Sequence, residues 1–133
     1  MLCPCCSGKR LTQCCGPLLA GQQHARTVKQ LMRSRFSAFA LGGHGDYLLA
    51  SWHPSTRPDI DAQTLGQRDT HWIRLDVVNT TQDGEHGTVT FCAYWQDESG
   101  QTHRHQEHSR FERIGGRWYY LDGDVTQSPT DAI

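Results

Sequence analysis

Five of the six cysteines in this chain lie between residues 3 and 15, in a stretch too short to form a hydrophobic core of its own. Four of them form two close thiol pairs, Cys3 with Cys5 and Cys14 with Cys15, on either side of the sequence Ser7-Gly8-Lys9-Arg10, which is typical of a turn. If the turn brings the pairs together, four thiolates can bind one tetrahedral ion. Zinc is the expected metal, one per chain, because it prefers sulfur ligands and four-coordinate sites. The expected ligands are Cys3, Cys5, Cys14 and Cys15.

Two other uses of these thiols are disulfide formation and redox chemistry. Neighbouring cysteines such as Cys14 and Cys15 fit ordinary disulfide geometry poorly. The N-terminus lacks the basic and apolar regions of a signal peptide, and no run of about 20 apolar residues could cross a membrane. We therefore expect a cytoplasmic protein, in which a cysteine cluster more often binds metal than forms crosslinks. Cys6 is a spare fifth thiol, which leaves a redox role and ligand exchange with Cys5 open.

The sequence Cys3-Pro-Cys-Cys-Ser-Gly-Lys-Arg-Leu-Thr-Gln-Cys-Cys15 resembles the SEC-C motif, named for the C-terminal tail of the SecA translocation motor. The resemblance rests on the cysteine spacing, the Ser-Gly turn and the basic residues that follow it. It implies zinc bound by the same four cysteines and a knot that contacts a protein partner. The sequence departs from the motif at Cys6, where the family usually has glycine.

Length and charge set limits on the rest of the chain. Its 133 residues suffice for one domain plus a small knot, and the net charge of −1 gives no overall basic bias that would suggest nonspecific nucleic-acid binding. We expect a zinc knot over residues 1–20, an α+β domain over 21–126 and a loose tail over 127–133.

The hydrophobic pattern changes from a helical to a strand period along the chain. Thr27 and Gln30 form a capping box before an apolar stripe of helical spacing, and Gly42 provides a stop, which predicts a helix over about 28–41. A second helix is expected from Tyr47 to about Trp52, capped by Asp46, and a short helical turn from Asp61 to Gly66. Four strands separated by turn signals are then expected to form an antiparallel meander, over 71–80, 88–96, 102–113 and 117–122.

This second part resembles the YchJ-like family of small bacterial proteins, in which a SEC-C motif precedes a domain like nuclear transport factor 2. The resemblance is carried by Leu31–Phe39, Asp46–Pro54, Glu107–Phe111 and Arg117–Gly123. It implies a cone of helices packed on a curved antiparallel sheet, with a pocket between them. Proteins with that fold include both enzymes and binding modules, so the fold alone does not indicate the function. Face-to-face pairing of such sheets makes a homodimer an expectation by analogy.

The third strand offers the candidate site residues of the domain. Side chains alternate along a strand, so Glu107 and Ser109 share a face with Phe111 and should point toward the helices. A carboxylate there must be paired or lie in a cavity that water can reach. Two interpretations follow: a structural ion pair with Arg33 or Arg35, or a carboxylate that faces a ligand.

Other candidates lie near the ends of elements. Trp52 is expected in the core, and His53 could act as a general base if it lines the pocket. Asp122 could reach the pocket mouth, although an Asp-Gly pair is more typical of a turn. His103 and His105 share a strand face, but the sequence offers no further ligands for a second metal site.

The leading functional hypothesis is a noncatalytic adaptor. Its knot, with Lys9 and Arg10 exposed, would dock a protein or ribonucleoprotein partner, and its domain would hold a small ligand near Arg35, Trp52, Glu107 and Ser109. The first alternative is a small-molecule enzyme that uses Glu107, His53 and Asp122 for acid–base chemistry. The second is a redox sensor that uses Cys6.

Overall fold

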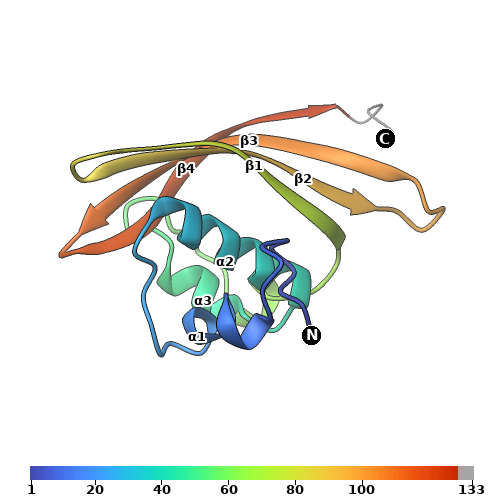
Figure 1. The fold of residues 1–133 in the computed structure, drawn as a ribbon, viewed down its shortest axis with the longest axis horizontal. Helices are drawn as coiled ribbons and strands as arrows, with labels where there is room; N and C mark the ends of the chain where they lie inside the picture. The colour runs from blue at the N-terminus through green and yellow to red at the C-terminus, as the bar shows by residue number, and fades with distance from the viewer. Residues whose placement is uncertain (129–133) are drawn as a thin grey trace.

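The computed structural model describes residues 1–128, which form a helical layer on one face of a curved antiparallel sheet (Figure 1). The α+β architecture expected from the sequence is confirmed. The helices are η1 (Leu11–Gln13), α1 (Gly16–Leu19), α2 (Val28–Leu41), α3 (Gly45–Ala50) and α4 (Ala62–Leu65). The strands are β1 (His71–Asp83), β2 (His86–Gln96), β3 (Thr102–Ile114) and β4 (Arg117–Ser128).

Helix α2 has the boundaries that its sequence signals predict. The Thr27 side chain accepts a hydrogen bond from the Gln30 backbone N–H, and the Gln30 side chain in turn accepts one from the backbone N–H of Arg26. Gly42 ends the helix with φ of +75°, a conformation that glycine adopts without steric cost. Because this helix carries Arg33, Arg35 and Phe36, it positions residues for both the knot and the interior of the domain.

Two helical predictions need correction. Helix α3 begins at Gly45 rather than Tyr47, and Asp46 lies in its first turn while His44 occupies the N-cap. The segment between the knot cysteines and α2, for which no helix was predicted, contains α1, whose first turn includes Pro17, a residue that fits a helix N-terminus. Leu18 of this helix is buried, so the segment belongs to the core.

The four strands form a meander in the order β1-β2-β3-β4, as predicted. Gly84, Gly100, Gly115 and Gly116 all have positive φ in the three connecting turns. Strand β4 is longer than expected: it continues through Asp122 and Gly123 to Ser128, so this Asp-Gly pair is not a turn. The first two residues of the expected C-terminal tail are therefore in β4, and residues 129–133 lie outside the described part of the chain.

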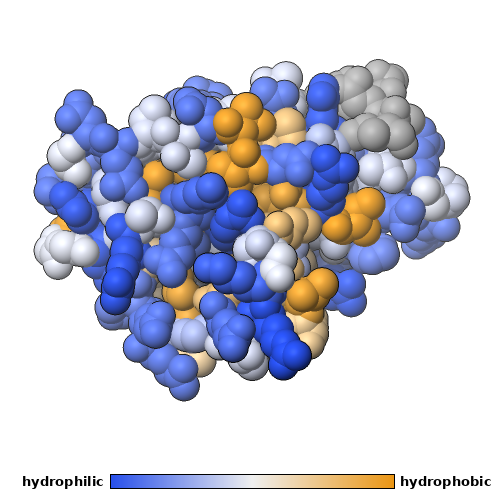
Figure 2. Space-filling model, viewed as in Figure 1, coloured by the Kyte–Doolittle hydropathy of each residue, from blue (hydrophilic) through white to orange (hydrophobic). Residues whose placement is uncertain are grey.

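One hydrophobic core joins the knot to the domain. Its buried members include three knot cysteines and Leu18, together with residues of α2 and the inner face of the sheet such as Phe36 and Phe111. Apolar side chains are visible among hydrophilic ones where the helices meet the sheet (Figure 2). No helix within residues 1–128 is both long and apolar enough to span a membrane.

Candidate metal centre and interior cavity

Residues 1–15 fold into a compact loop that brings the two thiol pairs together. A bridge between Leu2 and Arg10 and a hydrogen bond from the Cys3 N–H to the Lys9 carbonyl (2.9 Å) close the first half of this loop. The chain reverses through Gly8, which has φ of +84°, and through Cys6, which has φ of +66°. The knot then packs on α2, where Arg33 donates to the Cys5 carbonyl (2.6 Å).

The side chains of four cysteines converge at this place. The sulfur atoms of Cys3, Cys5, Cys14 and Cys15 all lie within 4.8 Å of one another. The Sγ of Cys14 is 3.6 Å from that of Cys5 and 4.0 Å from that of Cys15. A tetrahedral zinc site with Zn–S bonds of about 2.3 Å needs sulfur separations of about 3.8 Å. The residues present therefore fit a four-coordinate metal–thiolate site.

The electrostatics of the cluster also favour a cation. A hydrogen bond with Cys15 lowers the pKa of the Cys5 thiol to about 4 against the opposing effect of burial. The interaction with Cys5 and burial raise the pKa of Cys15, and burial raises that of Cys14. One thiolate therefore opposes ionisation of the next. A cation bound among the four sulfurs would offset this repulsion, because thiols bind a metal in their deprotonated form.

All six cysteines are free, and two of them, Cys6 and Cys92, do not belong to the four-sulfur cluster. Cys6 is exposed, and its thiol donates to the Pro4 carbonyl rather than facing the four sulfurs. Cys92 is half-buried on β2, a strand of the sheet. Ser7 is an addition that sequence reasoning did not single out: its hydroxyl lies 3.2 Å from the Cys14 sulfur.

A groove of about 530 Å³ runs beside the knot, along the start of α2. Its walls include Cys14 and the basic residues Lys9, Lys29 and Arg33. Lys9 and Arg10 are both exposed, as expected from the sequence. Charge along the chain is also uneven, because all 14 acidic residues follow residue 45 while six of the 13 basic residues precede it.

A second hollow, of about 280 Å³, lies between α2 and the inner face of the sheet. Most of its wall is apolar and aromatic, and the polar exceptions are Arg35, His105 and Glu107. We refer to it as the interior cavity. Its lining residues are Met32, Arg35, Phe36, Phe39, Trp52, Trp72, Phe91, Ala93, His105, Glu107 and Tyr120.

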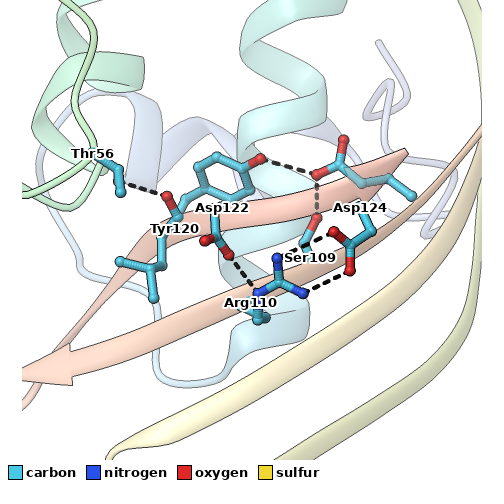
Figure 3. A network of polar contacts seen from close by, with 8 residues as sticks. Thr56, Ser109, Arg110, Tyr120, Asp122 and Asp124 are labelled. Atoms are coloured by element: carbon cyan, nitrogen blue, oxygen red, sulfur yellow. Dashed lines mark hydrogen bonds and ion pairs between the residues drawn. The ribbon is translucent and has the colours of Figure 1, made fainter.

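Glu107 faces this cavity and has three hydrogen-bond donors. Its Oε2 accepts from the hydroxyls of Ser109 and Tyr120, whose side chains point toward it (Figure 3), and its Oε1 lies 3.3 Å from Nε2 of His105. Burial raises the pKa of Glu107, but the three donors outweigh it and hold that pKa below its ordinary value. The carboxylate is therefore ionised at neutral pH. The face predicted from strand alternation is the one observed.

Arg35 lies in the same cavity wall but does not form an ion pair with Glu107 within the described residues. Its Nη1 donates to the Leu48 carbonyl (2.8 Å) and the Ser51 hydroxyl (2.6 Å). The guanidinium carbon is 4.8 Å from the centre of the Trp52 ring and 4.7 Å from that of Tyr120. Of the two interpretations of Glu107, the direct ion pair with Arg33 or Arg35 is thus wrong.

Two candidate catalytic residues lie away from the cavity. The Nε2 of His53 is 2.8 Å from Glu112, and its Nδ1 accepts from the Ser55 N–H, so both ring nitrogens already have partners. Asp122 pairs with Arg110, and its side chain is 49% exposed. In Figure 3, Asp122 and Asp124 both point toward Arg110 rather than toward Tyr120. Neither His53 nor Asp122 lines the cavity.

His105 was not among the candidate catalytic residues, although it contacts Glu107. The signal was available, because His105 shares its strand parity with Glu107 and Ser109. His103, by contrast, pairs with Asp97 (2.7 Å) and stacks on Trp95. The two histidines therefore have different partners and do not converge on a common site.

The fold and the cysteine cluster agree with what known proteins show. Residues 27–123 match the family described as the middle NTF2-like domain of YchJ. The chain is 44% identical over 129 residues to UPF0225 protein SG1365 of Sodalis glossinidius, covering 91% of this chain and 81% of that one. It is 43% identical to UPF0225 protein RSc0270 of Ralstonia nicotianae, covering 93% and 91% of the two chains.

A solved structure extends the likeness to the knot. RPA3114, a SEC-C motif containing protein from Rhodopseudomonas palustris, superposes with a TM-score of 0.84 at 35% identity, covering 96% of this chain and all of that one. The alignment therefore includes the cysteine loop as well as the α+β domain. On these grounds the chain belongs to the YchJ-like family of UPF0225 proteins.

Proposed function

We propose that this protein is a zinc-containing adaptor, in which a structural zinc ion fixes the knot and the knot surface docks an acidic protein partner. The observation that carries the proposal is the convergence of four sulfurs beside a groove with basic walls. A loop this small has too few apolar contacts to hold its shape alone, so metal binding supplies folding free energy. The zinc is structural because the four thiolates leave no open position for substrate.

The charge around the knot supports an acidic partner. A zinc ion with four thiolates carries a net charge of about −2. Arg10, Arg26 and the groove residues Lys9, Lys29 and Arg33 together exceed that charge, and no acidic residue precedes Asp46 to offset them. The groove beside the knot is thus lined by basic and not by acidic side chains, although the whole chain has no basic excess. Complementary charge of this kind speeds association and selects partners.

The test is affinity capture from lysate with the full-length, zinc-loaded protein. We expect the double variant Lys9→Glu/Arg10→Glu to lose a partner that the unmodified protein retains. A matched control is Arg57→Glu/Arg68→Glu, which reverses two exposed arginines outside the knot. Loss of the partner after ribonuclease treatment would identify a ribonucleoprotein in place of an acidic protein. Equal capture by all three proteins would count against docking through the knot.

A second candidate function is favoured by the interior cavity. The enzyme hypothesis requires a carboxylate that is not clamped by arginine and a histidine within its reach, and Glu107 and His105 meet that requirement. The pair could move a proton to or from a bound ligand. The test is untargeted mass spectrometry of a metabolite extract incubated with the protein. Conversion of a compound that is lost in Glu107→Gln but kept in Lys9→Glu/Arg10→Glu would support it, and no conversion would oppose it.

A further inference from the structure

The interior cavity has the size of a compact organic molecule. Its volume of about 280 Å³ corresponds to about nine water molecules, at about 30 Å³ each in the liquid. Aromatic side chains from both layers form most of the wall, including Phe36 of α2, Trp72 of β1 and Phe91 of β2. A ligand with a single ring would fill this space and contact those side chains.

Two opposite charges face the cavity without neutralising each other directly. Arg35 is only 3% exposed, and its hydrogen bonds go to a carbonyl and a hydroxyl rather than to a carboxylate. Burial lowers the pKa of Arg35 to about 10, which leaves it charged at neutral pH. A buried cation without an anionic contact is costly, so an anionic group beside it would be stabilising.

The tryptophan against which Arg35 packs adds an unsatisfied donor. The indole Nε1 of Trp52 is buried and has no hydrogen-bond partner in the described part of the chain. Glu107 favours a ligand group of the opposite kind, a cation or a donor, because its carboxylate is ionised and all its partners are donors. The Arg35 side of the wall therefore favours an anionic group, and the Glu107 side favours a cation or a donor.

We propose that the interior cavity binds a compact zwitterion with an aromatic body, its anionic group facing Arg35 and its cationic group facing Glu107. A ligand with only a cationic group would leave Arg35 unpaired and be repelled by it. A ligand with only an anionic group would leave Glu107 without a cationic partner and be repelled by it. A neutral hydrocarbon would displace water from both charges without replacing its hydrogen bonds. This inference does not depend on docking through the knot.

The probes for the test are matched in shape and differ in charge. They are 3- and 4-(aminomethyl)benzoate, which carry both charges at two spacings, together with benzylamine and benzoate, which carry one each. Binding to the full-length zinc-loaded protein is measured by intrinsic tryptophan fluorescence, to which Trp52 and Trp72 of the cavity wall contribute, with amide chemical shifts to locate the probe. We expect at least one zwitterion to bind about tenfold tighter than either singly charged probe, a difference of about 1.4 kcal/mol.

Variants separate the cavity from nonspecific binding. Glu107→Gln keeps the shape of the side chain and should weaken the zwitterion about tenfold or more while leaving benzoate binding unchanged or tighter. The matched control Glu112→Gln removes a carboxylate of the same strand that lies outside the cavity. This variant should bind all four probes with unchanged affinity. Absence of binding by both zwitterions, equal binding of benzylamine, or a contact map outside the cavity would each overturn the proposal.

Discussion

The hydrogen bond from Tyr120 to Glu107 gives a sharp test of the cavity. The hydroxyl of Tyr120 lies 3.0 Å from Oε2 of Glu107, and it is one of three donors that keep this carboxylate ionised. The change Tyr120→Phe removes that donor and leaves the ring against Trp52 and Phe111. It therefore perturbs the charge on Glu107 with little change in packing.

The size of the effect follows from the kind of bond that is lost. A hydrogen bond to a charged group contributes about 1.5–3 kcal/mol, and one pKa unit corresponds to about 1.4 kcal/mol. We therefore expect Tyr120→Phe to raise the pKa of Glu107 by about one to two units. The assay is a pH titration of the carboxyl carbon by NMR. The control is Tyr119→Phe, which removes the hydroxyl of the adjacent tyrosine, whose ring lies edge-on beside the His53 ring.

The substitution Tyr120→Phe should also alter how the free energy of unfolding depends on pH. Because the pKa of Glu107 is lowered in the folded state, its carboxylate stabilises the fold above the unfolded pKa and loses this effect as the pH falls through the folded pKa. Tyr120→Phe should thus destabilise the protein at neutral pH, and the difference should vanish in acid. An unchanged Glu107 pKa, or an equal shift in Tyr119→Phe, would refute this description of the carboxylate.

Three further substitutions test local features of the fold. Cys6→Gly should raise the free energy of unfolding by about 1 kcal/mol, because Cys6 has φ of +66°, which suits glycine. Thermal and chemical unfolding measure this gain in stability. The metal content should stay the same, and a loss of metal would contradict the prediction. Thr27→Ala removes the α2 cap and should cost about 1 kcal/mol, and an unchanged melting temperature would show that the cap is dispensable. Gly123→Ala would place a Cβ in steric conflict with the Glu107 carboxylate, so it should shift the NMR signals of that carboxyl, and an unchanged spectrum would contradict the close approach.

The parts of the fold with local signals could be predicted from sequence. Helix α2 has a cap, an apolar stripe and a terminal glycine within one short segment, and its predicted bounds agree with the structure. The hairpins likewise have glycine in their turns. The four cysteines were identifiable because their spacing alone can bring two thiol pairs together.

Features that depend on distant residues were missed. Strand β4 continues beyond Asp122 because Gly123 makes room for Glu107 of β3, and no local pattern reveals that contact. His53 was a candidate base because of its place at a helix end, yet Glu112, far along the chain, holds it outside the cavity. An ion pair of Glu107 with Arg33 or Arg35 was one of two interpretations, whereas the chain supplies Arg35 with a backbone carbonyl of α3.

The proposed binding of one zinc ion by four cysteines can be tested by native mass spectrometry with elemental analysis of the same sample. We expect one zinc per chain, retained in Cys6→Ser and lost in Cys14→Ser, because the Cys14 sulfur belongs to the cluster and the exposed Cys6 thiol does not. Metal-free protein, another metal such as iron in place of zinc, or loss of zinc in Cys6→Ser would contradict it.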